Sequence, residues 1–335
     1  MAEDVLADAI PAGLTRLLPW HHDLWRDVWG RVQNKRLPHA MLLRGPEGLG
    51  KQYFAHYLAL SLLCHQNGEE GAPCGYCKAC ELNRSSTHPD LISLTIEPER
   101  KSISIDQIRE LIEALSLKSQ YGHGKVVIVS PADALNNNAA NSLLKTLEEP
   151  HDDTVILLCT SKPASLPATI RSRCQLLHFQ SPDLAISKPW LSQRLPNEDI
   201  DLLLRLAAGA PLRAIKQLND GLTMIREHLL NDLESLVFNR GNPTIITEHW
   251  LKLGVKESLY SLYSWTVDMI RLSQVSEPAL LENPDIKQRL IRLSTQKDQK
   301  RLFHYLDKTA QIIRLLDEPL NQQLMLEDIL LDWSK

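Results

Sequence analysis

A glycine-rich turn that ends in a lysine is the first segment whose composition suggests chemistry. Gly45, Gly48 and Gly50 precede Lys51 and Gln52, a spacing that fits the phosphate loop G-x-x-x-x-G-K. Backbone N–H groups of such a loop approach phosphate oxygens, and the following helix N-terminus adds a favourable dipole. The sequence therefore predicts a nucleotide-binding loop in which Lys51 reaches the terminal phosphates. The alternative is a structural glycine turn with an unrelated lysine.

The residues that would hold Mg²⁺ beside this loop are of unusual types. Phosphate loops place Ser or Thr after the lysine as a metal ligand, whereas this chain has Gln52. An acidic pair is needed at the end of a buried strand, but the strand predicted at 126–129 is followed by Ser130 and Pro131. Asp133 offers a displaced acid, although a solvated or capping aspartate is the simpler interpretation. The pattern predicts no ATP hydrolysis and leaves nucleotide binding without hydrolysis open.

Four cysteines lie within seventeen residues, which suggests a metal site rather than disulfides. Cys64, Cys74, Cys77 and Cys80 have the spacing C-x9-C-x2-C-x2-C, and two-residue gaps let neighbouring sulfurs converge on one ion. Four thiolates suit tetrahedral Zn²⁺, so we expect a closed structural zinc site that fixes a long insertion. The alternative is a set of reduced cysteines without metal. Cys159, in a predicted strand, is expected to be a small core residue.

Alternating strands and helices over residues 39–180 are expected to position these motifs. Buried strands are predicted at 39–44, 91–96, 125–130, 154–159 and 175–179. Helices are predicted at 21–36, 52–64, 104–117 and 138–149. Ser104 and Gln107 have the spacing of a capping box at the start of the third of these helices. This order predicts an α/β fold with a doubly wound parallel sheet.

The pattern changes after residue 182, and no convincing strand follows. Residues 199–208 and 212–219 read as a small helical unit, and amphipathic helices from about residue 222 indicate an α bundle. We therefore expect a core at 1–180 that carries the phosphate loop and the cysteine insertion. A small helical unit at 181–222 and a helical bundle at 223–335 are expected to follow.

Composition narrows the class of protein. The chain has 335 residues and a formal net charge of −4, whereas free-standing DNA-binding proteins usually carry a strong basic excess. No apolar run approaches the roughly 18–20 residues of a membrane span. Residues 1–11 are acidic and lack the pattern of a secretory signal. We expect a cytoplasmic protein whose DNA contacts, if it makes them, are local or shared with partners.

Several segments together resemble a known family. The segments 141–150, 157–160, 166–167 and 170–174 resemble the AAA+ clamp-loader subunits of bacterial DNA polymerase III. The four cysteines lie where such subunits carry a zinc module, and the segment Thr87–Asp90 resembles the delta-prime branch. The resemblance is strong over 20–180, weaker over 181–225 and loose in the C-terminal bundle.

The resemblance implies a subunit of the DNA polymerase III holoenzyme that helps to load the sliding clamp onto primed DNA. It also implies that the helical unit at 181–222 is a lid and that the bundle at 223–335 is a collar for oligomerisation. Its partners would be gamma/tau-type and delta-type subunits in a hetero-pentamer, and the assembled ring would contact DNA phosphates without sequence preference. Arg173, in Ser-Arg-Cys, would be an arginine finger toward the γ-phosphate held by a neighbour; the alternative is a surface arginine. Thr160 would occupy a sensor position or be an ordinary strand-end threonine. Arg213 would be a second sensor, a relic or a phosphate ligand.

Two other functions remain open at this point. The first is the active, gamma/tau-like ATPase subunit of the same loader. The second is a zinc-containing nucleic-acid module without ring partners. Residues 71–80 contain one basic residue, Lys78, and one aromatic residue, Tyr76, which is little for a surface that binds single strands. The departures at Gln52, Ser130 and Pro131 favour a non-motor subunit with doubtful ATP binding.

Overall fold

The computed structural model describes residues 17–150, 153–238, 240–275, 278, 280–316, 318 and 320–334. The acidic segment 1–11 lies outside the described residues. The chain forms two compact units, each described by itself below. The first comprises Met1–Pro196 and Gly209–Arg213, and the second comprises Asn197–Ala208 and Ala214–Lys335. The division into core, lid and collar at residues 180 and 222 stays a prediction.

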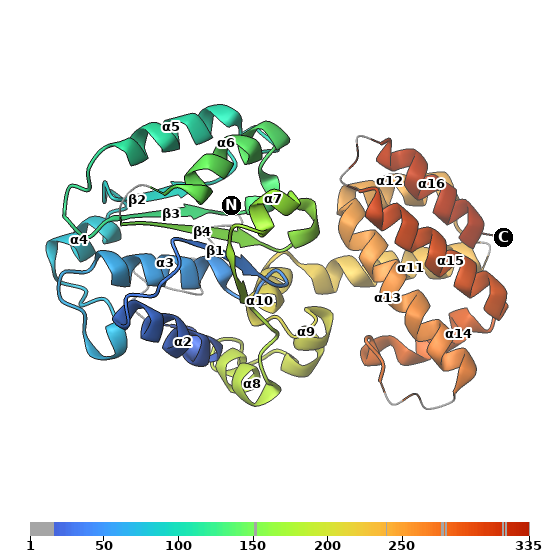
Figure 1. Cartoon of the computed structure of the whole chain (residues 1–335). Coiled ribbons are helices and arrows are strands. Elements are labelled where there is room, and N and C mark those ends of the chain that lie inside the picture. The colour runs from blue at the N-terminus through green and yellow to red at the C-terminus, as the bar shows by residue number, and fades with distance from the viewer. Residues whose placement is uncertain are drawn as a thin grey trace. The chain divides into compact units, whose positions relative to one another are not determined.

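The first unit is built on a parallel sheet whose five predicted strands are all confirmed (Figure 1). Its strands are β1 (Ala40–Arg44), β2 (Leu91–Leu94), β3 (Lys125–Val129), β4 (Thr154–Thr160) and β5 (Gln175–His178). Their order in the sheet is β2-β3-β4-β1-β5. The strand β1 lies between β4 and β5, and its Leu43 lies beside Cys159 on one side and Leu177 on the other. All carboxyl ends therefore meet at one edge, where the phosphate loop follows β1.

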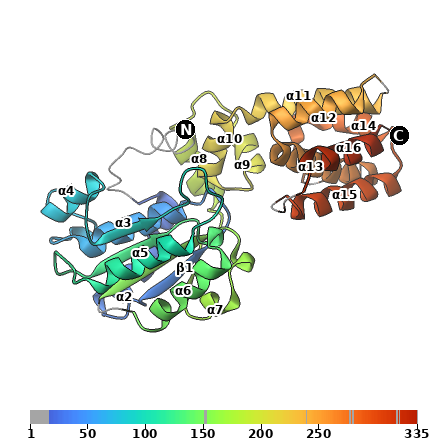
Figure 2. The same cartoon turned by 90° about the horizontal axis from the view of Figure 1, so that it is seen from above.

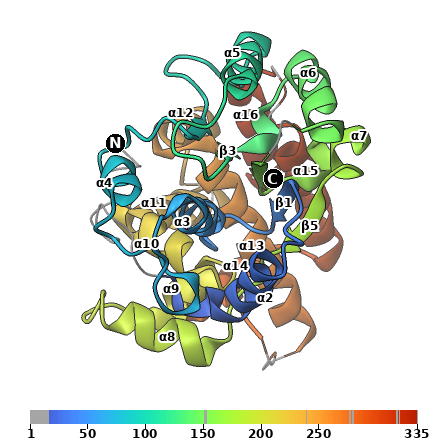
Figure 3. The same cartoon turned by 60° about the vertical axis from the view of Figure 1, so that its left-hand side comes forward.

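Helices cover both faces of the sheet (Figures 1 and 3). On one face, α2 (His22–Gln33) and α3 (Lys51–Leu63) pack on Met41 and Leu43. On the other, α5 (Ile105–Ser116), α6 (Asn137–Glu148) and α7 (Ala168–Arg171) pack on Ala40 and Leu42. Alternate residues of a strand point to opposite faces, so β1 serves both cores. The arrangement is an AAA+-like α/β fold, as predicted.

Helix starts follow the predicted capping chemistry where a capping side chain is present. At α5, the side chain of Ser104 accepts from the N–H of Gln107 at 3.3 Å, and the Gln107 side chain accepts from the N–H of Ser104 at 2.9 Å. This confirms the capping box. At α6, the side chain of Asn136 accepts from the N–H of Ala139 at 2.8 Å.

Two helices of the first unit lack a strong sequence signal. The helix α4 (Lys78–Arg84) is seven residues long, which is too short for an apolar period to stand out. The helix α8 (Leu184–Ser192) contains Pro189, a residue that usually indicates the end of a helix. The described residues also contain five short 3₁₀ turns, at Pro19–His21, Glu69–Gly71, Ala132–Ala134, Pro163–Ser165 and Pro284–Ile286.

The second unit is helical throughout its described residues (Figure 2). Its helices are α9 (Ile200–Leu206), most of α10 (Pro211–Asn219), α11 (Leu222–Val237), α12 (Pro243–Leu253), α13 (Val255–Gln274), α14 (Lys287–Ser294), α15 (Gln299–Arg314) and α16 (Gln322–Trp333). The apolar faces of α11 to α16 enclose one core that buries Trp250, Trp265 and Trp333 completely. The predicted C-terminal helical bundle is therefore confirmed. Over the described ranges, no helix is both long and apolar enough to span a membrane.

Candidate functional site

The phosphate loop connects the carboxyl end of β1 to the first residue of α3. The Nζ of Lys51 donates to the carbonyl oxygens of Gly45 and Pro46, at 2.7 Å in each case. The side chain of Lys51 is buried, and this burial lowers the pKa of its ammonium group. The lysine is therefore folded onto the carbonyls of its own loop, in the place where phosphate would compete for it.

Two aromatic residues ahead of α2 bind the outer side of this loop. The carbonyl oxygen of Leu49 accepts from Trp20 Nε1 at 3.0 Å and from His21 Nε2 at 2.8 Å. The His21 ring packs edge-on against Phe54 and Phe179, at 5.5 and 5.3 Å between centroids. Burial lowers the pKa of His21 to about 4, so the ring is neutral near pH 7 and carries its proton on Nε2. The sequence gives no signal for these contacts.

Arg213, the residue expected as a second sensor, lies against the same loop. The N–H of Leu212 donates to the carbonyl oxygen of Gly48 at 3.1 Å. Gly48 has a φ of +82°, and a Cβ built on it would lie 2.4 Å from the Cβ of Arg213. Only glycine fits there, because any side chain would collide with the backbone that carries the arginine. The structure thus brings Arg213 beside the phosphate loop.

The two positions that would supply magnesium ligands face each other. Ser130 Oγ, after β3, donates to Gln52 Oε1 of α3 at 3.5 Å. Neither residue offers a carboxylate. Asp133 is engaged elsewhere, since its Oδ1 accepts from Thr160 Oγ1 at 2.6 Å and from the N–H of Ser161 at 3.2 Å. Asp133 and Thr160 therefore tie the 3₁₀ turn after β3 to the carboxyl end of β4.

Arg173 is held on its own chain at the C-terminal end of α6. Its Nε donates to Glu148 Oε1 at 2.5 Å, and its Nη2 forms an ion pair with the same oxygen. Its Nη1 donates to the carbonyl oxygen of Thr169 at 2.9 Å and to Ser172 Oγ at 3.5 Å. The sequence motif located the arginine but gave no sign of the glutamate that pairs with it.

The four predicted cysteines converge in the structure. Cys64 follows α3, Cys74 and Cys77 lie in the loop, and Cys80 is in α4. Their Sγ atoms all lie within 4.8 Å of one another, and three pairs are separated by 3.8, 3.9 and 4.0 Å. Tetrahedral zinc with Zn–S bonds of about 2.3 Å places its sulfurs about 3.8 Å apart. The sulfur positions therefore fit a tetrahedral metal ion.

The acidities of the thiols also favour a cation at the centre of the cluster. Burial works to raise the pKa of Cys77, but the N–H groups of Cys80 and His65 and the neighbouring thiols lower it to about 6. Burial raises the pKa of Cys64 and Cys80 instead. Without a cation, Cys64 and Cys80 therefore stay protonated at neutral pH, and all four cysteines would become thiolates only around a positive charge such as a divalent metal ion.

The loop that carries the cysteines is docked onto α2. Trp25 Nε1 donates to the carbonyl oxygen of Glu70 at 2.9 Å, and Trp29 stacks on Trp25 with 5.4 Å between ring centroids. A Cβ on Gly71, whose φ is +80°, would lie 1.8 Å from the Trp29 indole. The two tryptophans thus hold the loop through its backbone, and glycine is required at the contact.

The segment Thr87–Asp90 has a structural role. The buried carboxylate of Asp90 accepts from Ser119 Oγ and from the N–H groups of Gln120 and Tyr121, each at 3.0 Å for its closest oxygen. His88 Nδ1 accepts from the N–H of Asp90 at 3.1 Å. The motif therefore anchors the turn between α5 and β3.

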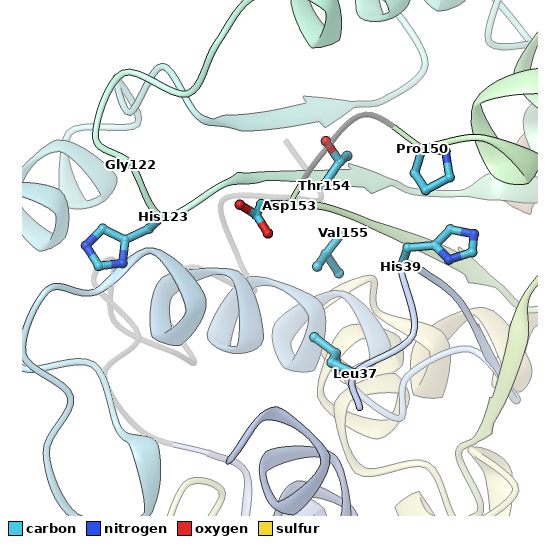
Figure 4. A pocket seen from close by; sticks show the side chains of 8 residues that line it. All are labelled: Leu37, His39, Gly122, His123, Pro150, Asp153, Thr154 and Val155. Atoms are coloured by element: carbon cyan, nitrogen blue, oxygen red, sulfur yellow. The ribbon is translucent and has the colours of Figure 1, made fainter. Parts of the chain in front are cut away.

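A cavity of about 590 Å³ opens at the amino ends of β1, β3 and β4 (Figure 4). It is lined by Leu37, His39, Gly122, His123, Pro150, Asp153, Thr154 and Val155. The phosphate loop follows the carboxyl end of β1, at the opposite edge of the sheet. Ligands of open α/β sheets bind at the carboxyl ends, so this cavity is separate from the predicted nucleotide site. It contains no predicted site residue.

Comparisons with known proteins agree with this architecture. The family model described as "DNA polymerase III, delta subunit" matches residues 20–183, and the one described as "DNA polymerase III, delta subunit, C terminal" matches residues 221–335. DNA polymerase III subunit delta′ of Pseudomonas aeruginosa is 34% identical over 95% of this chain and 97% of its own length.

Two further matches are narrower or more distant. Subunit tau/gamma of Haemophilus influenzae is 33% identical over 57% of this chain and 29% of its own length. A DNA polymerase III gamma subunit-related protein of Thermotoga maritima superposes with a TM-score of 0.42 at 21% identity, over 92% of this chain and 98% of that one. The two family models and the relative at 34% identity over 95% of the chain show that the chain belongs to the DNA polymerase III delta′ subunit family.

Proposed function

We propose that this chain is a non-motor subunit of the clamp loader, which helps to load the sliding clamp onto primed DNA. The observation that carries the proposal is the facing pair Gln52 and Ser130, at 3.5 Å. These residues occupy the positions of the metal ligands, so no hydroxyl directly follows Lys51 and no carboxylate directly follows β3. The nearest acid after β3, Asp133, is engaged by Thr160 and Ser161. Lys51 is bonded to its own loop and would have to leave these carbonyls to bind ATP.

Arg173 is the residue that we propose acts in catalysis, on the ATP of a neighbouring subunit. A guanidinium directed at the γ-phosphate stabilises the charge that develops during transfer. One third of the Arg173 side chain is exposed in the chain by itself, at 33%, so a partner can reach it. The Ser-Arg-Cys context supports this role, and the absence of magnesium ligands in this chain does not affect it.

The test is the ATPase rate of a reconstituted loader that contains Arg173→Ala. Arginine fingers contribute about 10³–10⁵ in kcat, so the hydrolysis at the site facing this subunit should be lost. Arg171→Ala is the matched control, because Arg171 is an exposed arginine two residues away. An ATPase rate equal to wild type in Arg173→Ala, with assembly intact, rejects the finger.

The cysteine cluster is proposed to hold one structural Zn²⁺. Three of the sulfur separations, at 3.8–4.0 Å, match tetrahedral coordination, all pairs lie within 4.8 Å, and all four positions would be filled by protein ligands. No position is left open for water or substrate, so the ion would stabilise the insertion and take no part in hydrolysis.

A gamma/tau-like active ATPase is the second candidate. The complete glycine and lysine pattern, the nearby Arg213 and the partial match to tau/gamma favour it. ATP hydrolysis by the purified chain, abolished in Lys51→Ala, would establish this candidate and overturn the non-motor proposal.

The remaining proposals carry over partners, domain roles and sensor positions from the family to this chain. We propose gamma/tau-type and delta-type subunits as partners in a hetero-pentamer, with a lid at 181–222 and an oligomerisation collar at 223–335. Thr160 would occupy a sensor position, and Arg213 would be a relic of a second sensor or a phosphate ligand. Contact with primed DNA phosphates would come from the assembled ring in the cytoplasm. Co-purification of these partners with the chain, lost when residues 223–335 are deleted, tests the collar assignment.

A further inference from the structure

The guanidinium of Arg173 is occupied in the chain by itself. Nε and Nη2 both bind Glu148 Oε1, and Nη1 binds the carbonyl oxygen of Thr169. The edge formed by Nε and Nη2 is also the edge that a guanidinium presents to phosphate in a bidentate pair. Glu148 therefore occupies the same donors that a phosphate would take.

The surroundings of this ion pair favour a contact between Glu148 and Arg173 that can form and break. Glu148 is the last residue of α6, where the helix dipole is negative, and the exposed Glu149 follows it. Both features attract a cation to this helix end. The side chains are 33% exposed for Arg173 and 47% exposed for Glu148, so water and salt screen the pair. Exposed pairs of this kind are weak enough to exchange.

We propose that Glu148 is a positioning residue that holds Arg173 against its own chain and releases it to the γ-phosphate of a neighbouring subunit. The inference rests on the proposed role of Arg173 in trans. A terminal phosphate carries more negative charge than one carboxylate, so it displaces Glu148 when the neighbour approaches. Until then, the ion pair keeps the arginine in one defined position at the surface.

Glu148→Gln in the reconstituted loader tests the proposal. Loss of the charge frees Arg173, and kcat/KM for ATP is expected to rise by up to about fivefold, the factor that a surface pair of about 1 kcal/mol represents. The rise should appear mainly as a lower KM, because saturating ATP already displaces the Glu148 carboxylate in the wild-type complex. Glu149→Gln removes the same charge from the same helix end and is the matched control, since Glu149 is not among the partners of Arg173.

The expected pattern is specific to Arg173. The effect of Glu148→Gln should disappear in an Arg173→Ala background, whereas a general effect on stability or assembly would persist there. If Arg173→Ala lowers the rate but Glu148→Gln leaves kcat/KM unchanged or reduces it, the role of Glu148 is refuted and the finger stands. If Arg173→Ala has no effect, both proposals are overturned.

Discussion

Replacing His21 by glutamine is expected to remove part of the acid sensitivity of the first unit. The ring is 2% exposed and donates from Nε2 to Leu49, and burial lowers its pKa to about 4. In the unfolded chain the ring titrates near 6.5, so between these values the unfolded chain binds a proton that the folded chain excludes. The associated stability is fully present above pH 6.5 and is lost as the pH falls toward 4.

The magnitude follows from the two pKa values. Well below both of them, the loss of unfolding free energy due to His21 is about 3 kcal/mol. Between pH 7.5 and pH 5.0, the same linkage lowers the free energy of unfolding by about 2 kcal/mol. Glutamine keeps an N–H donor for the Leu49 carbonyl but has no titration in this range. The free energy of unfolding of His21→Gln should therefore fall by about 2 kcal/mol less than that of the wild type over this interval.

Native-state hydrogen exchange in peptides from β1 and α3, at pH 7.5 and 5.0, measures the unfolding free energy of this unit. His56 and His88, whose pKa values burial also lowers, are present in both proteins and cancel in the comparison. His22→Gln, a change at an exposed neighbour, should behave like wild type. If the unfolding free energy of His21→Gln changes with pH as much as that of the wild type, the buried His21 ring accepts a proton as readily in the folded chain as in the unfolded chain.

Three further changes test the cysteine loop and its support. Cys77→Ser should reduce bound zinc from about one equivalent to well below it, as measured by metal analysis, and a wild-type protein without zinc would reject the metal assignment. Gly71→Ala should destabilise the first unit by about 1–3 kcal/mol in urea, because a Cβ there would lie 1.8 Å from the Trp29 ring. Gly68→Ala is the control and should have a smaller effect, because the nearest atom to a Cβ at that position is 3.6 Å away. Equal effects of the two changes would contradict this reasoning. Asp90→Asn should cost about 2 kcal/mol in the same assay, since a charged acceptor of three donors is lost, and an unchanged midpoint would argue against that role.

Features that depend on neighbours along the chain were predictable. The phosphate loop and the cysteine cluster are defined by spacing, and the structure forms both where they were expected. The strands were predictable because β-branched and apolar runs such as 126–129 have few alternatives in an α/β protein. The capping box of α5 is equally local. These predictions needed no knowledge of tertiary structure.

Contacts between distant segments were not predictable from the same sequence. Leu49 is bound by residues 28 and 29 positions away, and the partner of Arg173 lies 25 positions away. The fully buried Asp268 of the second unit accepts from Asn283 at 2.7 Å, fifteen positions along the chain. A polar side chain carries no periodic signal for its partner, because the fold chooses that partner. Such pairs include the contacts that hold the phosphate loop at Leu49 and the ion pair of Arg173.

One feature of the fold links the two motifs that seemed independent in the sequence. The helix α3 begins at Lys51 and ends one residue before Cys64, so thirteen helical residues separate the phosphate loop from the cluster. A helix of this length is a stiff rod of about 20 Å. A coloured or paramagnetic metal ion exchanged into the cysteine cluster would therefore report on movement of this helix. If an anion that binds at Lys51 shifted α3 along its axis, the absorption or magnetic spectrum of the ion would change.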